Sequence, residues 1–454
     1  MLFQSQGFIL IFLPATLAAF YALANRPTGR EYALILASLI FYGWWDPRFI
    51  PLLVGQTIFT WMIAEAFLRK PSPFWIWIGV AANLAVLGFF KYALFVAGAA
   101  VSFVGLPEPG WNIVLPIGIS FYTFELVSYL VDLKRGTGGH YGLRKFCLFI
   151  FLFPHLIAGP IIRHNEIIPQ FDESPFRPGL AQRFGWGIAF FVVGCAKKVL
   201  IADPLARIID PIFNIHRIPA LTDAWLGALG FTFQLFLDFS AYSEMAIGLG
   251  LMLGLRFPDN FNVPYRATDI REFWQRWHMT LSRWLRDYLY IPLGGSRNGT
   301  AVYIKATLIT MGLCGLWHGA GFTFIAWGLM HGVALIVCHV WQRNGRELSA
   351  SVGWAVTMVF VIVGWVVFRA DDFASAGQML AGMIGSGGIA GDTRWPLVLA
   401  AAALVSLVGP STKDFVEENL QPRPIYGAGL AATAVLVILL VGMGQPQNFI
   451  YFQF

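Results

Sequence analysis

Apolar segments long enough to cross a lipid bilayer recur along this 454-residue sequence, and they constrain its fold more than any other feature. A membrane-spanning helix needs about 20 mostly apolar residues. Candidate segments fall at 7–25, 32–46, 50–68, 74–104, 113–133, 145–162, 185–202, 222–253, 302–317, 320–341, 352–369, 395–410 and 427–444. The pattern predicts an all-α polytopic integral membrane protein with about 11 to 13 membrane helices. Segments 74–104 and 222–253 exceed one span, and we expect each to hold two.

Composition supports this class and excludes several others. Charged residues make up 12% of the chain, against about 25% in an average soluble domain. The net charge of the chain is +6. In a membrane protein such an excess of basic residues is expected in the cytoplasmic loops, so the charge does not indicate nucleic-acid binding. The four cysteines lie in or beside apolar segments without paired spacing, so we expect neither a disulfide framework nor a metal site.

Charges near the amino terminus predict the orientation of the first span. Ala22-Leu23-Ala24 resembles a signal-peptide cleavage site, but no Lys or Arg precedes the apolar segment, whereas Arg26 and Arg30 follow it. We therefore expect an uncleaved first helix with its amino terminus on the periplasmic side. Further clusters of Lys and Arg lie at 69–70, 134–135, 144–145, 197–198 and 343–346. They set the topology, or one or two of them hold the phosphates of an anionic cofactor; the sequence does not distinguish these roles.

Two half-polar segments interrupt the apolar body. Residues 115–124 (LPIGISFYTF) carry Pro116 and Gly118 where a helix would start or break. Residues 153–163 carry two prolines flanking His155. Broken helices persist in a membrane only where protein or a water-filled cavity satisfies the backbone. Both segments therefore indicate an internal cavity, with His155 interpreted as a packed, hydrogen-bonded residue.

The most unusual stretch runs from 256 to 331. It starts with a charged, Trp-rich segment in which Asp269 and Glu272 have the form of a helix start. Apolar and aromatic residues then recur at three- and four-residue intervals as far as Tyr288, which predicts one amphipathic helix over 269–288. Either this helix lies on the cytoplasmic face of the membrane, or it turns inward and forms a wall of a reaction chamber that contains His278.

His318 follows this segment, inside an apolar run and just before Gly319 and Gly321. An ionisable group at membrane depth is costly and is a functional hypothesis by default. A neutral imidazole there could take the proton of a hydroxyl that attacks an activated acyl group. The alternative is a buried histidine that only bridges helices. Sequence signatures of serine hydrolases, zinc proteases, P-loop and Rossmann proteins do not occur.

Several motifs resemble the membrane-bound O-acyltransferase (MBOAT) superfamily, in particular its bacterial branch for alginate O-acetylation. They are REFWQRWH (271–278), YLYIPLGG (288–295), LWHGA (316–320), residues 115–124 and FIYFQF (449–454). The resemblance covers nearly the whole chain. It implies a single membrane domain over 1–454 with a core catalytic segment at 256–341, and interfacial or re-entrant helices around a central tunnel.

The resemblance also implies a mechanism. The family's histidine maps onto His318 as general base. A second polar position forty residues upstream maps onto His278, which would orient the acceptor or the thioester, or polarise its carbonyl. Trp274, Trp277, Arg276 and Arg283 are candidates for the tunnel or the CoA entrance. Asp203 matches another polar position, with a structural or cofactor-binding role.

The expected donor is acetyl-CoA, used as a substrate, with no permanently bound cofactor and no metal. The expected partners are a periplasmic acetyl-relay protein, a polysaccharide acceptor and the lipid bilayer, and the expected location is the bacterial inner membrane. Two alternatives remain: transfer of D-alanyl or another acyl group to a cell-wall polymer, and transport of a small solute through the same cavity.

Overall fold

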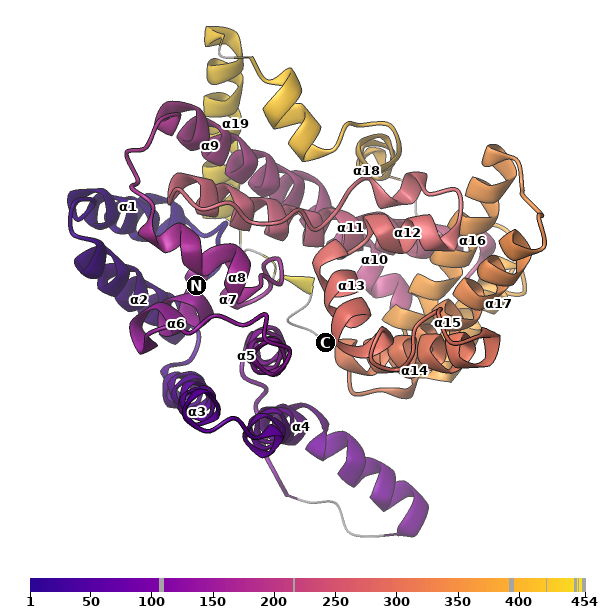
Figure 1. Ribbon diagram of the computed structural model, residues 1–454. Coiled ribbons are helices and arrows are strands. Elements are labelled where there is room, and N and C mark those ends of the chain that lie inside the picture. Colours follow the sequence, from indigo (N-terminus) through magenta and orange to yellow (C-terminus); the bar gives the residue numbers. More distant parts are fainter. Residues whose placement is uncertain are drawn as a thin grey trace. The chain divides into compact units, whose positions relative to one another are not determined.

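The computed structural model describes residues 1–105, 110–214, 217–391, 396–421, 423–444, 447 and 449–450. All elements assigned within these ranges are helical (Figure 1), which confirms the all-α class. Residues 451–454 of the FIYFQF motif lie outside the described part. Within the described ranges, eight helical segments are long and apolar enough to cross a membrane: Pro47–Arg69, Pro73–Val101, Leu180–Phe213, Leu221–Met252, Thr300–His318, Phe322–Arg343, Ala350–Arg369 and Pro424–Met443. The shorter apolar helices Phe8–Ala22 and Leu397–Leu407 add to these, so the expected 11 to 13 included segments shorter than a full span.

The chain forms two compact units, which we describe separately. The first comprises residues 1–192, 242–258 and 441–443, and the second comprises 193–241, 259–440 and 444–454, as far as these are described. His278 and His318 both belong to the second unit.

In the first unit, helices α3, α4 and α6 pack against α5, whose residues are almost all buried. Its helices are η1 (Phe8–Phe12), α1 (Leu13–Ala22), α2 (Pro27–Gly43), η2 (Pro47–Phe49), α3 (Ile50–Arg69), α4 (Pro73–Val104), α5 (Ile119–Lys134), α6 (Leu143–Phe151), α7 (Phe153–Leu156), α8 (His164–Ile167), η3 (Ile168–Asp172) and most of α9 (Leu180–Ala196). Buried amides and hydroxyls join α3, α4 and α5. Gln56 donates to Asn83 (3.3 Å), Asn83 donates to Thr60 (2.9 Å), and Tyr122 donates to Gln56 (3.2 Å). Such hydrogen bonds stabilise the association of helices inside a membrane, where the hydrophobic effect contributes little to it.

The two half-polar segments pack against each other in the first unit. Gly118 begins α5 with φ of 75°, and a Cβ there would lie 2.7 Å from the carbonyl oxygen of Leu156. This approach requires glycine. His155 Nδ1 lies 3.0 Å from Glu125 Oε1, and both side chains are almost fully buried. His155 is therefore packed beside a buried carboxylate, whereas its Nε2 atom has no hydrogen-bond partner among the described residues.

Three expectations about helix boundaries are wrong. Helices α4 and α11 (Leu221–Met252) each run for 32 residues without a break. Asp238 lies inside the continuous helix α11, where Lys198 pairs with it. Conversely, 145–162 is no continuous span, because α6 ends at Phe151 before Pro154.

The second unit holds the remaining helices. They are η4 (Lys197–Ala202), α10 (Asp203–Phe213), the first part of α11, η5 (Pro264–Arg266), α12 (Ile270–Arg276), α13 (Met279–Leu285), η6 (Arg286–Tyr290), α14 (Thr300–His318), α15 (Phe322–Arg343), α16 (Ala350–Arg369), α17 (Phe373–Met383), α18 (Leu397–Leu407), η7 (Asp414–Asn419) and α19 (Pro424–Met443). Helix α17 was not predicted, and it begins where the Asp372 carboxylate accepts a hydrogen bond from the Ser375 amide (2.7 Å).

A buried ion cluster joins three elements of the second unit. Lys198 Nζ, on η4, lies 2.8 Å from Asp203 Oδ1 on α10 and 2.5 Å from Asp238 Oδ1 on α11. The other Asp238 oxygen accepts a hydrogen bond from the Ile450 amide at 2.7 Å. Buried charges persist when they are paired and hydrogen-bonded, so the cluster fixes η4, α10, α11 and Ile450 together.

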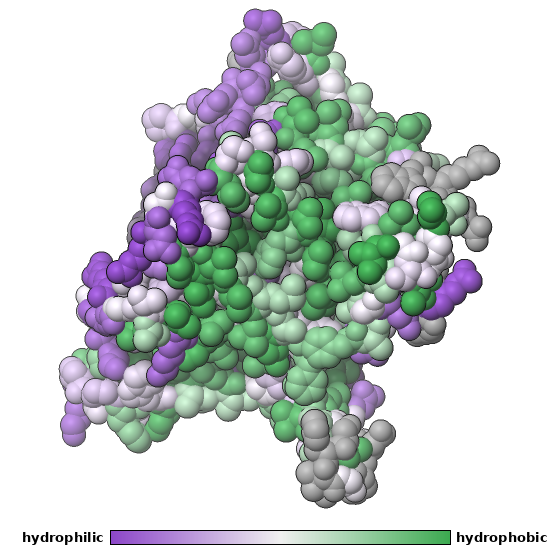
Figure 2. All heavy atoms as spheres, turned by 90° about the vertical axis from the view of Figure 1, so that its right-hand side faces the viewer, coloured by the Kyte–Doolittle hydropathy of each residue, from purple (hydrophilic) through white to green (hydrophobic). Residues whose placement is uncertain are grey.

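The surface seen in Figure 2 is largely hydrophobic, with hydrophilic residues gathered along one border. Large apolar side chains are exposed on the candidate spans, for example Val333, Val337 and Val356, each more than half exposed. Such a surface is expected where helices face lipid. The chain is a multi-pass membrane protein.

Candidate active site

Two antiparallel helices carry His318. α14 ends at His318, residues Gly319–Gly321 make the turn, and α15 returns alongside it (Figure 1). Their backbones nearly touch: a Cβ on Gly315 would lie 2.1 Å from the Phe324 carbonyl oxygen, and one on Gly328 would lie 2.1 Å from that of Met311. Close packing through small residues is typical of helix pairs in membranes. The hairpin therefore positions His318 through its backbone.

Aromatic rings surround the imidazole of His318, which is only 3% exposed. Its ring centroid lies 4.9 Å from that of Trp317, 5.2 Å from Trp327 on α15 and 5.3 Å from Phe368 on α16. A Cβ on Gly319 would lie 2.1 Å from the Phe324 ring. The expected close approach at Gly319 is therefore made to an aromatic side chain of the same hairpin.

A break in the helix predicted over 269–288 presents His278. Asp269 does cap the helix start, because its Oδ1 accepts a hydrogen bond from the Glu272 amide at 2.8 Å. However, α12 ends at Arg276, and His278 adopts the left-handed conformation (φ 43°, ψ 54°) before α13 begins. The prediction of one continuous helix is wrong. A non-glycine residue held at positive φ is strained, and such residues concentrate at functional sites.

Asn260 holds this break in place. Its backbone oxygen accepts from the Met279 amide (2.9 Å), and its side-chain Oδ1 lies 3.0 Å from His278 Nδ1. The same Oδ1 accepts from the Thr280 hydroxyl (2.9 Å) and the Thr280 amide (3.4 Å). Since a backbone N–H can only donate, the Asn260 atom that faces it is the oxygen, and His278 must carry its proton on Nδ1. The Nε2 atom of the neutral imidazole is then a hydrogen-bond acceptor.

Burial also determines the charge of His278. The side chain is fully buried, with ring contacts to Phe239 (4.7 Å) and Trp317 (6.1 Å). Desolvation lowers the pKa of His278 to about 3, so its imidazole is neutral at physiological pH. Trp317 thus contacts both histidines that the sequence singled out.

The predicted tunnel tryptophans lie in a packed aromatic core. Trp277 is 1% exposed, and its ring centroid is 4.9 Å from that of Trp365. The Trp274 indole donates to His331 Nδ1 at 3.2 Å, and the His331 ring lies 4.7 Å from Trp327, which packs on His318. The two indoles therefore belong to the aromatic core that packs against His318 through Trp327. Their assignment to CoA binding stays a prediction.

The predicted basic residues differ in their surroundings. Arg276 is partly exposed and paired with Glu272 at 2.7 Å, one helical turn earlier. Arg283 lies on α13 and is half-buried. Asp203 and Lys198 belong to the buried ion cluster, so Lys198 is not available for a phosphate group. Lys197 donates to the Thr412 hydroxyl at 2.6 Å.

Sequence reasoning missed the residues that hold the two histidines. Asn260 lies in a loop without a distinguishing pattern, and only the fold brings it to His278. Phe239, Trp327 and Phe368 look like ordinary apolar residues of spans. The pairing of Lys198 with Asp238 had a signal, because a charge inside an apolar segment demands a partner.

Within the described residues, His, Cys, Asp and Glu form no group of three that could hold a metal ion. Comparison with known proteins gives the decisive finding. Residues 76–371 match the membrane-bound O-acyltransferase family, MBOAT. The chain belongs to this family. It is therefore a membrane-bound O-acyltransferase, as the motifs around His278 and His318 predicted.

Curated relatives with several acyl acceptors in their names resemble this O-acyltransferase. A probable alginate O-acetylase of Pseudomonas syringae pv. tomato is 44% identical over 398 residues, covering 85% of this chain and 76% of the relative. A peptidoglycan O-acetyltransferase of Helicobacter pylori is 36% identical over 426 residues, covering 86% and 81%. A teichoic acid D-alanyltransferase of Bacillus subtilis is 29% identical over 288 residues, covering 59% and 71%.

Proposed function

We propose that this O-acyltransferase moves acetyl groups from cytoplasmic acetyl-CoA towards hydroxyls of an exported polysaccharide of the alginate or cellulose type. The similarity to the probable alginate O-acetylase over 85% of the chain carries the proposal. The enzyme would lie in the bacterial inner membrane with its amino terminus in the periplasm. Acetyl-CoA is too charged to cross the bilayer, so a passage through the protein must bring donor and acceptor together. The acetyl group reaches the polymer directly or through a periplasmic partner protein.

His318 is the general base in this proposal. As the acceptor oxygen attacks the thioester carbonyl, its proton passes to the imidazole. The tetrahedral intermediate then collapses, the C–S bond breaks, and the sulfur leaves with the proton that His318 had taken. Atoms and charges balance without a metal or redox group. The rigid hairpin supports this role because general-base catalysis depends on a fixed position of the imidazole.

His278 has a complementary role. With its proton on Nδ1 and directed to Asn260, neutral His278 presents an accepting Nε2. An acceptor atom cannot donate a hydrogen bond to a carbonyl oxygen that gains negative charge. Of the three roles expected for His278, its tautomer therefore favours orientation of the acceptor, through a hydroxyl other than the one that attacks, over polarisation of the thioester carbonyl.

Acetyl transfer in proteoliposomes tests the proposal. Wild-type enzyme, His318→Ala and His140→Ala are supplied with radiolabelled acetyl-CoA, a periplasmic partner and glycan. His140 is an exposed histidine of the first unit, and its variant is the matched control. We expect CoA release from wild type and His140→Ala, and a loss of at least about 100-fold in His318→Ala, the lower range for removal of a general base. Normal transfer by folded His318→Ala would refute the assignment.

Transfer of D-alanyl groups is a second candidate, favoured by the similarity to the teichoic acid D-alanyltransferase. The same assay distinguishes it by the donor. Turnover of a D-alanyl thioester, with acetyl-CoA inactive and His318 still required, would replace the acetyl donor and leave the acyltransferase mechanism intact.

A further inference from the structure

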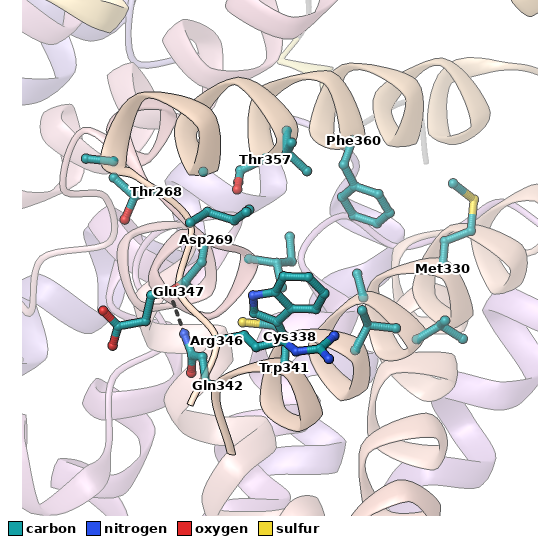
Figure 3. Close-up of a pocket in the computed structure, with 18 of the residues that line it drawn as sticks. Thr268, Asp269, Met330, Cys338, Trp341, Gln342, Arg346, Glu347, Thr357 and Phe360 are labelled. Atoms are coloured by element: carbon teal, nitrogen blue, oxygen red, sulfur yellow. Dashed lines mark hydrogen bonds between the residues drawn. The ribbon is translucent and has the colours of Figure 1, made fainter. Parts of the chain in front are cut away.

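An apolar groove with a volume of 1110 Å³ runs between α15 and α16 and ends at the start of α12 (Figure 3). Its walls are aliphatic and aromatic side chains, including Val333, Val337 and Val356, which are all more than half exposed. This volume slightly exceeds the range of about 300–1,000 Å³ for small-molecule pockets. Because α15 and α16 are both candidate membrane spans, the groove opens where lipid is expected.

The dimensions of the groove match one leaflet of a bilayer. Its lining extends along α16 from Ala350 to Phe360 and along α15 from Ala326 to Trp341. At 1.5 Å rise per residue, these stretches measure about 15 Å and about 22 Å. One leaflet measures about 15 Å across its hydrocarbon part and about 20 to 22 Å with the headgroup region included. Acyl chains of a lipid in one leaflet would therefore fit along the groove.

Charged side chains gather at one end of the groove. Arg346 and Glu347 line this end beside Trp341, and all three are exposed. The Arg346 guanidinium lies 5.2 Å from the Trp341 ring. Neither Arg346 nor Glu347 forms an ion pair within the described part of the chain. Tryptophan and arginine at the end of an apolar surface are typical of the headgroup level of a membrane.

The nearby carboxylate of Asp269 is already engaged. Its Oδ1 caps α12, and its Oδ2 accepts from the Gln342 amide at 3.0 Å, the contact drawn as a dashed line in Figure 3. This leaves Arg346 and Glu347 as one cation and one anion on neighbouring residues. Together they complement a headgroup that carries both charges.

We propose that the groove binds one phospholipid molecule with a phosphate and a primary ammonium in its headgroup, that is, a phosphatidylethanolamine. Its acyl chains lie between α15 and α16, Arg346 contacts the phosphate, and Glu347 contacts the ammonium group. Phe360 forms part of the groove wall, and its ring lies 5.0 Å from that of His331 on the inner side. The bound lipid therefore covers the outer side of the aromatic core that supports His318.

Native mass spectrometry of the delipidated full-length protein tests this site. The protein is offered an equimolar mixture of dioleoyl phosphatidylethanolamine and dioleoyl phosphatidylglycerol. Val356→Trp fills the groove, whereas Val359→Trp lies outside it on the same helix. The two valines are 56% and 53% exposed, so the variants form a matched pair.

We expect Val356→Trp to retain about tenfold less lipid than wild type, the effect of about two methylene groups that can no longer be buried. Val359→Trp should bind as wild type does. Wild type should prefer phosphatidylethanolamine by about two- to fivefold, as exposed charge pairs allow. Glu347→Gln should abolish this preference, whereas Arg343→Gln, next to the groove but outside its lining, should keep it.

Equal lipid retention by the two tryptophan variants would overturn the site. A preference of wild type for phosphatidylglycerol, or no preference, would overturn the headgroup assignment. A photo-crosslinking residue at position 356 adds an independent readout in intact cells. Recovery of phosphatidylethanolamine supports the proposal, whereas recovery of a protein helix would show that a partner subunit occupies the groove.

Discussion

Neutral, buried His278 makes the stability of this protein sensitive to acid. In an unfolded chain a histidine takes up a proton below about pH 6.5. Folded His278, with its pKa lowered to about 3, does not. Between these two values the unfolded state binds more protons, so the free energy of unfolding falls as the pH falls. Each pH unit in this window costs about 1.4 kcal/mol.

The perturbation is His278→Gln, which removes the titrating group and keeps a polar side chain beside Asn260. From pH 7.5 to pH 5.0, His278 costs wild type about 2 kcal/mol, since only the 1.5 units below pH 6.5 count. For a chain of this size that corresponds to a change in melting temperature of roughly 2 °C. The His278→Gln variant should not show this fall in melting temperature between pH 7.5 and pH 5.0.

The assay is thermal unfolding in detergent at pH 7.5 and 5.0, followed by the reaction of a thiol-specific dye with the buried cysteines. Other acid-sensitive groups affect both proteins equally, so the comparison is the difference between their two shifts. His140→Gln removes an exposed histidine and serves as the control for the loss of one histidine far from Asn260 in the sequence. Identical shifts in wild type and His278→Gln would show that His278 is not held neutral in the folded protein.

Two further substitutions test the buried framework of the second unit. Lys198→Met leaves Asp203 and Asp238 buried without their cation and should destabilise the protein by about 3 to 5 kcal/mol, measured by thermal unfolding. Lys197→Met, which removes the neighbouring cation and leaves the pairs of Lys198 intact, should cost far less. Equal losses in the two variants would contradict the pairing. Gly328→Ala places a methyl group against a backbone carbonyl and should move α14 away from α15. We expect the rate of acyl transfer to fall at least about tenfold while the protein still inserts into the membrane. Full activity of this variant would show that the hairpin tolerates a wider spacing of its helices.

The sequence predicted those parts of the fold that depend on local pattern. Apolar length located most of the spans, and the Asp269 cap located the start of α12. The break at His278 could not be predicted, because hydrophobic periodicity continues across it to Tyr288. Asn260, which stabilises the break, is a tertiary partner from an irregular loop. The continuity of α11 likewise depends on Lys198, which comes from another element.

The candidate site shows the same division. Motif spacing singled out His318 and His278, and both contact Trp317 in the structure. The sequence also suggested Trp274 and Trp277 for the tunnel, because they lie on the apolar aromatic stripe of the segment that contains His278. Only the packing of Trp277 against Trp365, and of Trp274 against His331, shows that these indoles lie in an aromatic core. A one-dimensional pattern cannot distinguish a ring that faces a cavity from one that faces another ring.

The hydrogen bond from the Ile450 amide to Asp238 has a consequence for biosynthesis. Its two partners are 212 residues apart, which the ribosome takes about 10 to 40 s to translate. During that interval Asp238 is already in the membrane and can pair with Lys198. The second carboxylate oxygen of Asp238, however, still lacks the Ile450 amide. We therefore expect the nascent enzyme to pass through an incompletely folded stage in the membrane. In this stage water or a chaperone must donate a hydrogen bond to the Asp238 carboxylate until the segment with Ile450 has been synthesised.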